Sequence, residues 1–200
     1  MIKKIIILAI LLLALSACTT GNGDGLELPT KINQWAIAAE ASDSYGGLFG
    51  GNRDDQSPFA ATGEPDVTEC GENQRAWVIS QDNDGLHWLE LSYDKEVYVS
   101  SVKVIESFNP GAVVKIELKN DSDYFTLWEG SYKTKDCSYT LEKKYQEIQG
   151  NITSNMTSFS TDKVRITVNT DVAGWNEIDA VELAGYEQKW HIYNDTLVIE

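Results

Sequence analysis

Residues 174–183 read Gly174-Trp175-Asn176-Glu177-Ile178-Asp179-Ala180-Val181-Glu182-Leu183. The Gly-Trp pair predicts a turn that leads into a short strand near the end of the fold. In this strand Ile178 and Ala180 share one phase of the two-residue repeat, whereas Val181 and Leu183 share the other. A β-bulge near Ala180 brings both sets to one core, and we expect a bulge there.

Two further stretches carry strong turn signals. Residues 106–113 read Glu-Ser-Phe-Asn-Pro-Gly-Ala-Val, in which Asn-Pro-Gly predicts a turn between two apolar strands. Residues 61–66 read Ala-Thr-Gly-Glu-Pro-Asp and are followed by Ala76-Trp77. In this order the three stretches resemble the discoidin-like, galactose-binding-like family, in a branch found in extracellular multidomain proteins and some F-box proteins. The resemblance covers residues 35–186 and implies an antiparallel jelly-roll β-sandwich.

The residue pattern predicts an all-β fold independently of that resemblance. Residues 35–40, 86–93, 97–108 and 163–169 predict short strands, and no long amphipathic helix is apparent. Residues 112–119 alternate, so that Val114, Ile116 and Leu118 are expected to face the core. A turn at residues 120–122 then predicts a hairpin with residues 124–128.

The end of the chain lies outside the family resemblance. Residues 187–200 offer two apolar segments around Asn194-Asp195, and they predict an appended C-terminal hairpin. Because two strands alone are marginally stable, this hairpin should pack on the sandwich or on a partner. Residues 131–160 are the least patterned, and residues 141–149 fit either a helix or a polar strand.

The N-terminus has the features of an export signal. Lys3 and Lys4 precede an apolar run that ends in Leu-Ser-Ala-Cys, which resembles a bacterial lipobox with Cys18 as the lipidated residue. The run is too short for a ~20-residue membrane span, whereas an ordinary secretory signal remains an alternative. We therefore expect a signal peptide at 1–17, a flexible tether at 18–34 and a lipid-anchored, extracytoplasmic protein, on the outer membrane if the cell has two.

The net charge excludes one class of partner. The chain has 16 basic and 31 acidic residues, which give −15 at pH 7. Removing residues 1–17 takes away two lysines and no acid, so the mature chain carries 14 basic residues and a charge of −17. We expect no nucleic-acid binding through phosphate neutralisation, and membrane contact only through the lipid.

Two cysteines remain once Cys18 is assigned to the lipid. Cys70 and Cys137 form an even pair in a chain that we expect to be exported, which predicts a disulfide between them. Two free thiols are the alternative. In the disulfide the Cα atoms should lie about 4.4–6.8 Å apart.

The sequence does not favour an enzyme. The histidines are His87, which we expect at a strand end, and His191 in the appended hairpin, and no Gly-x-Ser-x-Gly motif occurs. A pair of carboxylates of the glycosidase type cannot be judged from residue counts among so many acids. Because the resembled family is mostly non-catalytic, we expect a binding module for glycans or glycoconjugates. A structural or protein-interaction lipoprotein of the cell envelope is the alternative.

Recognition in the resembled family lies in loops at one end of the sandwich. The resemblance places Tyr45, Trp77, Asn109, Trp175 and Asn176 at that end. Rings supply stacking area and amides supply directional hydrogen bonds, so these five are the expected ligand-binding residues. The alternative is structural: both tryptophans close the core, and both asparagines bond backbone within their turns.

The resemblance also implies a structural calcium ion where the loop after the first strand meets the last strand. Asp66 and Glu177 are the expected metal ligands, together with loop carbonyls. Thr62 stands where calcium-binding relatives have an aspartate, which removes one charged ligand. A role for Asp66 and Glu177 in capping turns is the alternative.

Overall fold

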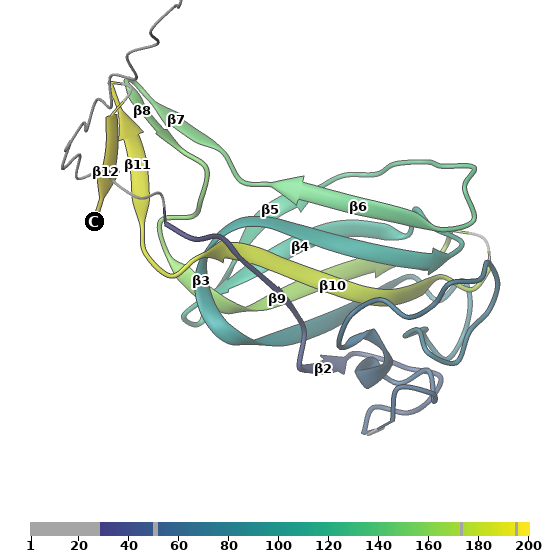
Figure 1. Ribbon diagram of the computed structural model, residues 1–200. Coiled ribbons are helices and arrows are strands. Elements are labelled where there is room, and N and C mark those ends of the chain that lie inside the picture. Colours follow the sequence, from purple (N-terminus) through teal and green to yellow (C-terminus); the bar gives the residue numbers. More distant parts are fainter. Residues whose placement is uncertain (1–28, 50–51, 173, 195) are drawn as a thin grey trace, which may run out of the picture.

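The computed structural model describes residues 29–49, 52–172, 174–194 and 196–200. The fold is an antiparallel β-sandwich, in which the one described helical turn is the 3₁₀ helix η1 (Pro58–Ala61) (Figure 1). Within the described part of the chain, no helix is long and apolar enough to cross a membrane. The expected signal peptide, the lipidation site Cys18 and most of the expected tether lie outside the described residues.

The long strand β3 (Leu86–Phe108) belongs to both layers of the sandwich. Its first half pairs with β2 (Ala38–Ala41) and β9 (Ser160–Asn169), and its second half pairs with β10 (Glu177–Tyr186) and β6 (Tyr139–Lys144). The register with β9 shifts between Ser92 and Val97, where β3 curves from one layer to the other (Figure 1). The sequence predicted two strands here, because the polar residues at the bend interrupt the apolar pattern.

The remaining strands extend these two layers. β4 (Val113–Asn120) forms a hairpin with β5 (Asp123–Glu129) and pairs with β9 on its other side. β1 (Ile32–Trp35) pairs with β10. The expected single strand at residues 35–40 is therefore wrong. The strand is interrupted after Trp35, so that β1 pairs in one layer and β2 in the other. Ala36, which lies between the two strands in the sequence, is buried.

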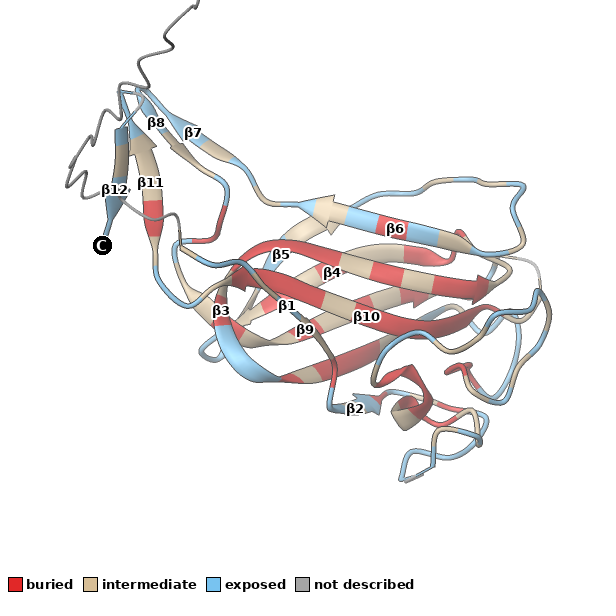
Figure 2. Ribbon diagram, in the orientation of Figure 1, coloured by how far each residue is buried: buried red, intermediate tan, exposed pale blue. Residues whose placement is uncertain are grey.

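The core lies between the layers and follows the predicted alternation (Figure 2). Leu89, Leu91, Ile116 and Leu118 are completely buried. Val114, however, is only half-buried, and Val113 takes the core position, because the register with β9 shifts between Val113 and Lys115.

The bulge predicted in the opening stretch is confirmed. The register of β10 against β3 shifts between Ile178 and Ala180, and Ile178, Val181 and Leu183 all reach the same core. Asp179 is left under the loop before β3, where its carboxylate accepts hydrogen bonds from the N–H groups of Asp66 (3.3 Å) and Val67 (3.2 Å).

A separate four-stranded sheet, here called the small sheet, stands at one end of the sandwich (Figure 1). It contains β7 (Glu147–Gln149), β8 (Ile152–Ser154), β11 (Trp190–Tyr193) and β12 (Thr196–Ile199). The predicted C-terminal hairpin is therefore confirmed, and β8 pairs with it. Residues 141–149 form strands, β6 and β7, rather than a helix.

Candidate ligand-binding cleft

Loops gather at the end of the sandwich opposite the small sheet (Figure 1). A cleft of about 240 Å³ lies among the loop after β2, the loop before β3 and the loop between β9 and β10. Its lining residues are Tyr45, Gln56, Glu72, Gln74, Val78, Trp175 and Glu177. The structure thus brings the predicted rings of Tyr45 and Trp175 together, and it adds three polar side chains that the sequence did not single out.

The two rings form an aromatic pair in the cleft wall. The centroids of Tyr45 and Trp175 are 6.0 Å apart and the ring planes meet at 84°, an edge-to-face arrangement. Tyr45 is 62% exposed, whereas Trp175 is half-buried. One ring is therefore free to contact a ligand while the other holds its orientation.

Hydrogen bonds tie the loop after β2 to the loop before β3. The N–H of Tyr45 donates to the carbonyl of Val78 (2.9 Å), and the N–H of Gln56 donates to the carbonyl of Gln74 (2.8 Å). Gly46 lies so close to the backbone of Asp55 that a Cβ atom there would overlap its carbonyl. These contacts fix the backbone on which Tyr45 and both glutamines stand.

The loop that carries Trp175 is held by the predicted Asn-Pro-Gly turn. The Asn109 side-chain amide donates to the carbonyl of Trp175 (2.8 Å), and the Asn176 amide donates to the carbonyl of Asn109 (2.7 Å). Gly174 has φ +89°, and a Cβ atom there would lie 2.7 Å from the Asn109 amide nitrogen. Asn109 and Asn176 therefore bond backbone and position Trp175, and neither lines the cleft.

Comparison with known proteins places the chain in a family. Residues 29–194 match the family model of the C-terminal SD scarf domain of pappalysin-1. The chain belongs to this family. It is also 28% identical to F-box/LRR-repeat protein 4 of Bos taurus over 109 residues, which span 51% of this chain and 17% of that protein. The matching stretch thus spans less than a fifth of that relative's length.

Solved structures share the fold at low identity. The family 32 CBM of C. perfringens NanJ, in complex with galactose, superposes with a TM-score of 0.50 and 14% identity, over 76% of this chain and 99% of that one. The truncated AlyQ, with CBM32 and alginate lyase domains, gives a TM-score of 0.50 and 15% identity over 80% of this chain and 35% of that one. At this identity the likeness establishes the galactose-binding-like sandwich predicted from the sequence.

Glu177 forms part of the cleft of the scarf domain and is nearly inaccessible to solvent (1% exposed). Both of its carboxylate oxygens accept the N–H of Asn73, at 3.0 and 3.1 Å. Burial raises the pKa of Glu177 to about 7, the Asn73 hydrogen bond opposes that rise, and the charge of Glu72 adds to it. The cleft therefore changes charge near neutral pH.

Trp77 lies in the core of the scarf domain and does not line the cleft. Its side chain is 1% exposed, and its indole N–H donates to the carbonyl of Asp43 (3.1 Å). Its backbone bridges to Ile178 at the start of β10, which places Trp77 at the loop end of the sandwich, where its ring fills the core. For Trp77 the structure agrees with the structural alternative, in which this tryptophan closes the core.

The expected calcium ligands each have a partner within the protein. Asp66 forms an ion pair with Arg53 (3.3 Å), and Glu177 binds Asn73 as described above. Among the described residues, the one group of three or more metal-binding side chains close together is Asp43, Asp84 and His87. Calcium at Asp66 and Glu177 stays an untested prediction.

The predicted Cys70–Cys137 disulfide is confirmed, with a Cα separation of 5.8 Å.

His87 is the second residue of β3 and therefore lies at a strand end, as expected. The Oγ of Ser42 lies 3.3 Å from Nδ1 of His87, within reach of a hydrogen bond. Ser42 is already engaged, however, because its Oγ accepts the N–H of Trp88 (3.0 Å). Neither residue lines the cleft.

Proposed function

We infer that this scarf domain is a non-catalytic binding module that recognises glycans or glycoconjugates through the cleft beside Tyr45 and Trp175. The observation that carries this inference is the aromatic pair in a cleft whose other walls carry amide and carboxylate groups. Similar sandwiches include carbohydrate-binding modules, one of them in complex with galactose, which supports this ligand class.

The chemistry of the lining suits a sugar. A sugar ring presents C–H groups on one face, which stack on an exposed ring such as Tyr45, and hydroxyl groups around its edge. Gln56 and Gln74 each supply hydrogen-bond donors and an acceptor, while Glu72 accepts from hydroxyl groups. The cleft is smaller than the ~300–1,000 Å³ that drug-sized ligands occupy, so it suits one sugar unit, such as a chain end.

The charge of the cleft narrows the ligand class. Glu72 and Glu177 line it, no lysine or arginine of the described residues does, and the net charge of the whole chain is −15. Acidic sugars would meet like charge without a compensating cation. We therefore expect neutral or amino sugars to bind better than uronic or sialic acids.

The proposed cellular setting is the outside of a bacterial membrane. Cys18 would carry the lipid, and the residues up to 34 would form the tether. The disulfide supports an oxidising, extracytoplasmic compartment. In a cell with two membranes we expect the outer one, with a glycan or a surface protein as partner.

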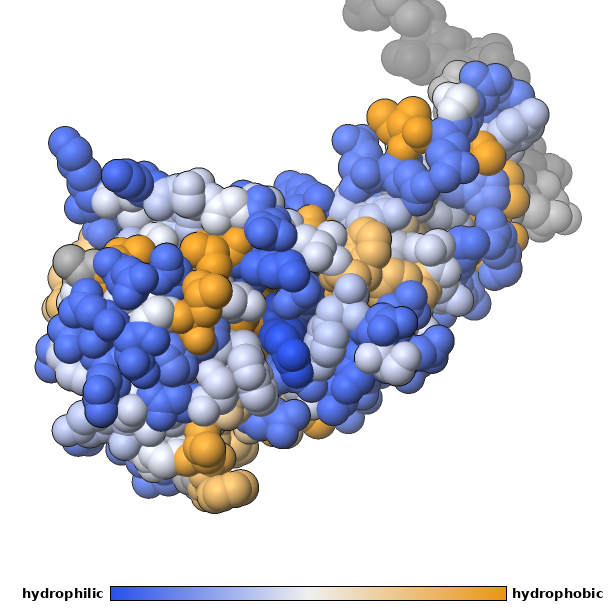
Figure 3. Space-filling view, turned by 180° about the vertical axis from the view of Figure 1, so that it is seen from behind, coloured by the Kyte–Doolittle hydropathy of each residue, from blue (hydrophilic) through white to orange (hydrophobic). Residues whose placement is uncertain are grey.

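A second candidate function is docking of an envelope protein on the small sheet. Ile148, Tyr193 and Ile199 are exposed there at 66%, 48% and 40%. Apolar side chains project between hydrophilic ones at that end of the molecule (Figure 3), and a hollow of about 360 Å³ lies beside His191 and Glu200. This surface would serve a protein partner independently of the cleft.

The test is binding of the purified protein to a glycan array of neutral, amino and acidic sugars, with and without calcium. We expect binding to neutral or amino sugars, and a loss of about tenfold or more in Tyr45→Ala and Trp175→Ala. Tyr193→Ala is the matched control, since it removes an exposed ring from the small sheet. Folded cleft variants that bind like the wild type would refute the cleft. If Tyr193→Ala were the one variant that lost binding to the array, the glycan site would lie on the small sheet.

A further inference from the structure

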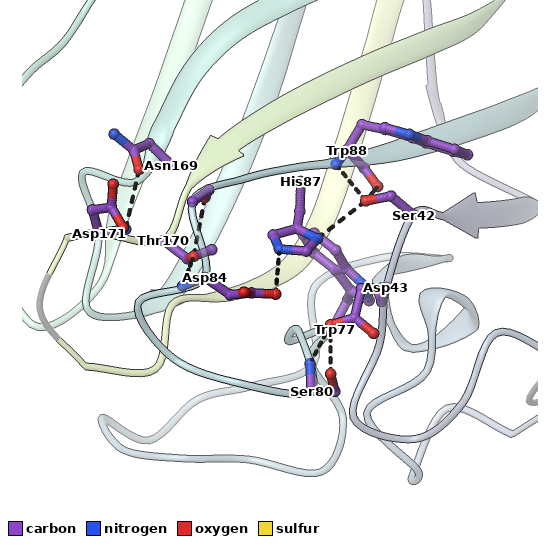
Figure 4. A network of polar contacts seen from close by, with 11 residues as sticks. Ser42, Asp43, Trp77, Ser80, Asp84, His87, Trp88, Asn169, Thr170 and Asp171 are labelled. Carbon is purple, nitrogen blue, oxygen red and sulfur yellow. Dashed lines mark hydrogen bonds and ion pairs between the residues drawn. The ribbon is translucent and has the colours of Figure 1, made fainter.

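Three potential metal ligands converge beneath the loop end, outside the cleft. Asp43 follows β2, Asp84 lies in the turn before β3, and His87 is the second residue of β3. One carboxylate oxygen of each aspartate and one ring nitrogen of His87 all lie within 4.8 Å of one another. Figure 4 shows the three side chains entering the same space from separate segments.

The imidazole of His87 is aimed into this cluster with one nitrogen unsatisfied. Its Nε2 is buried and has no hydrogen-bond partner among the described residues, although it lies 3.3 Å from Oδ2 of Asp84. Its Nδ1 lies 3.3 Å from Oγ of Ser42. A buried nitrogen without a hydrogen bond is costly, and here it faces two carboxylates.

Both aspartates are held in place by second partners. Oδ2 of Asp43 accepts hydrogen bonds from the N–H (2.8 Å) and the hydroxyl (2.6 Å) of Ser80. The N–H of Asp84 donates to Oγ1 of Thr170 (3.0 Å), a residue that is itself buried (Figure 4). In the described part of the chain neither carboxylate pairs with a lysine or arginine.

The charge distribution around the cluster suits a cation. Asp43 and Asp84 bring two carboxyl groups to within 4.8 Å of each other and of a His87 ring nitrogen. Since no lysine or arginine of the described residues offsets these two groups, a divalent ion between them would relieve their mutual repulsion.

We propose that Asp43, Asp84 and His87 bind one divalent transition-metal ion of the zinc class. Imidazole nitrogen with carboxylate oxygen is a donor set suited to such ions, whereas calcium takes oxygen ligands alone. If Nε2 binds the metal, Nδ1 carries the proton, and the Nδ1–H group donates a hydrogen bond to Oγ of Ser42. Ser42 then has the orienting role that second partners of ligating histidines usually have.

The cluster needs only a small closure to hold the ion. Zinc ligands at about 2.0–2.2 Å in a tetrahedral arrangement lie roughly 3.5 Å from one another. The present spread of up to 4.8 Å therefore requires movement of about 1 Å. Asp84 can supply it, since its side chain is 55% exposed and stands in a turn between Asn83 and Gly85, both with positive φ.

The experiment is equilibrium dialysis of the purified protein against micromolar ZnCl₂, with CoCl₂ as a spectroscopic probe. We expect one ion per chain, a cobalt absorption band, and a higher melting temperature with the metal. His87→Gln and Asp84→Asn should each weaken binding about tenfold or more and remove the thermal shift. CaCl₂ should not compete, which separates this site from the calcium site expected at Asp66 and Glu177.

Two control variants match these substitutions. His191→Gln removes the other histidine of the chain, and Asp171→Asn removes an exposed acid of the neighbouring loop. Both should bind zinc like the wild type. The proposal is overturned if the wild type retains no zinc, if folded His87→Gln binds it unchanged, or if His191→Gln loses it equally. None of these results depends on glycan binding.

Discussion

Asn109 and Trp175 are joined by a hydrogen bond of 2.8 Å, from the Asn109 side-chain amide to the Trp175 carbonyl. The two residues belong to different loops, 66 positions apart in the sequence. Asn109 also has φ +44°, a left-handed conformation that asparagine tolerates better than most residues. One side chain thus satisfies a backbone requirement in its own turn and fixes the loop that carries a cleft ring.

Two substitutions of Asn109 separate these roles. Asn109→Gly keeps the positive φ and loses the hydrogen bond, so we expect destabilisation by ~1 kcal/mol. Asn109→Ala loses both and should cost ~2 kcal/mol. Urea unfolding measures both variants. If the two variants lose equal free energy of unfolding, the positive φ at position 109 does not contribute to the cost of Asn109→Ala. Both should weaken glycan binding, since Trp175 loses its support.

The disulfide should contribute strongly to stability, because Cys70 and Cys137 are separated by 67 residues. In the chain-entropy model, closing a loop of this length stabilises the fold by about 4 kcal/mol. We expect the double variant Cys70→Ser, Cys137→Ser to lose stability of that order in urea unfolding. Reductant should bring the wild type to the same value and leave the double variant unchanged. A loss below about 1 kcal/mol would contradict this account.

The sequence predicted those features of the fold that depend on local pattern. The bulge at Ala180 follows from a phase change in one strand, and the disulfide follows from the number of cysteines. The continuity of β3 could not be predicted, because its polar bend resembles a loop and is held by pairing with β9 and β10.

The candidate sites were predicted only in part, for a similar reason. Tyr45 and Trp175 stand beside glycines in recognisable turns. Gln56 and Gln74 lie in loops without periodicity, and a hydrogen bond between distant backbone segments brings them together. The convergence of Asp43 on His87 likewise depends on tertiary structure, because no short spacing in the sequence marks these ligands.

A buried ion pair on the outer face of the sandwich provides a third prediction. Arg165 donates to Oε2 of Glu90 from Nε (3.0 Å) and Nη2 (2.8 Å). Its guanidinium lies 4.6 Å from the ring centroid of Trp88 and 4.1 Å from that of Tyr124, whose hydroxyl also donates to Glu90. Glu90 is only 3% exposed, so removal of the arginine leaves a buried charge without a counter-ion.

We expect Arg165→Ala to lower the free energy of unfolding by ~2–3 kcal/mol, as measured by urea unfolding. This loss is smaller than the ~3–5 kcal/mol for breaking a fully buried pair, because Arg165 is partly solvent-exposed. The double variant Glu90→Gln, Arg165→Met should recover most of this loss, because it leaves no charge behind. Arg53→Ala is the control: it breaks a more exposed pair with Asp66 and should cost less than about 1 kcal/mol. Equal losses for Arg165 and Arg53 would argue against the buried pair.

Glu106 makes the stability of the fold depend on pH. It lies in β3, is 2% exposed, and its Oε1 accepts the N–H of Gly111 (3.0 Å). Burial raises its pKa from 4.5 to about 7, and hydrogen bonds from the backbone of residues 111–113 only partly oppose that rise. The folded state therefore holds this proton more tightly than the unfolded chain does.

The sign of the effect follows from proton linkage. Between pH 4.5 and about 7 the folded state binds more protons at Glu106 than the unfolded state, so stability falls as pH rises and is level above that range. The full contribution is up to about 3 kcal/mol. Glu177, with its pKa also raised to about 7, acts in the same direction.

Glu106→Gln should remove the part of this dependence that belongs to Glu106. The amide oxygen can still accept the N–H of Gly111, and no charge forms at high pH. We expect the variant to match the wild type near pH 5 and to exceed its stability by ~1–2 kcal/mol at pH 8, as measured by urea unfolding at both values. Exposed Glu64→Gln is the control and should leave the difference between the two pH values unchanged. If Glu106→Gln shows the same decline from pH 5 to pH 8 as the wild type, this residue does not hold the proton, and Glu177 becomes the group to test.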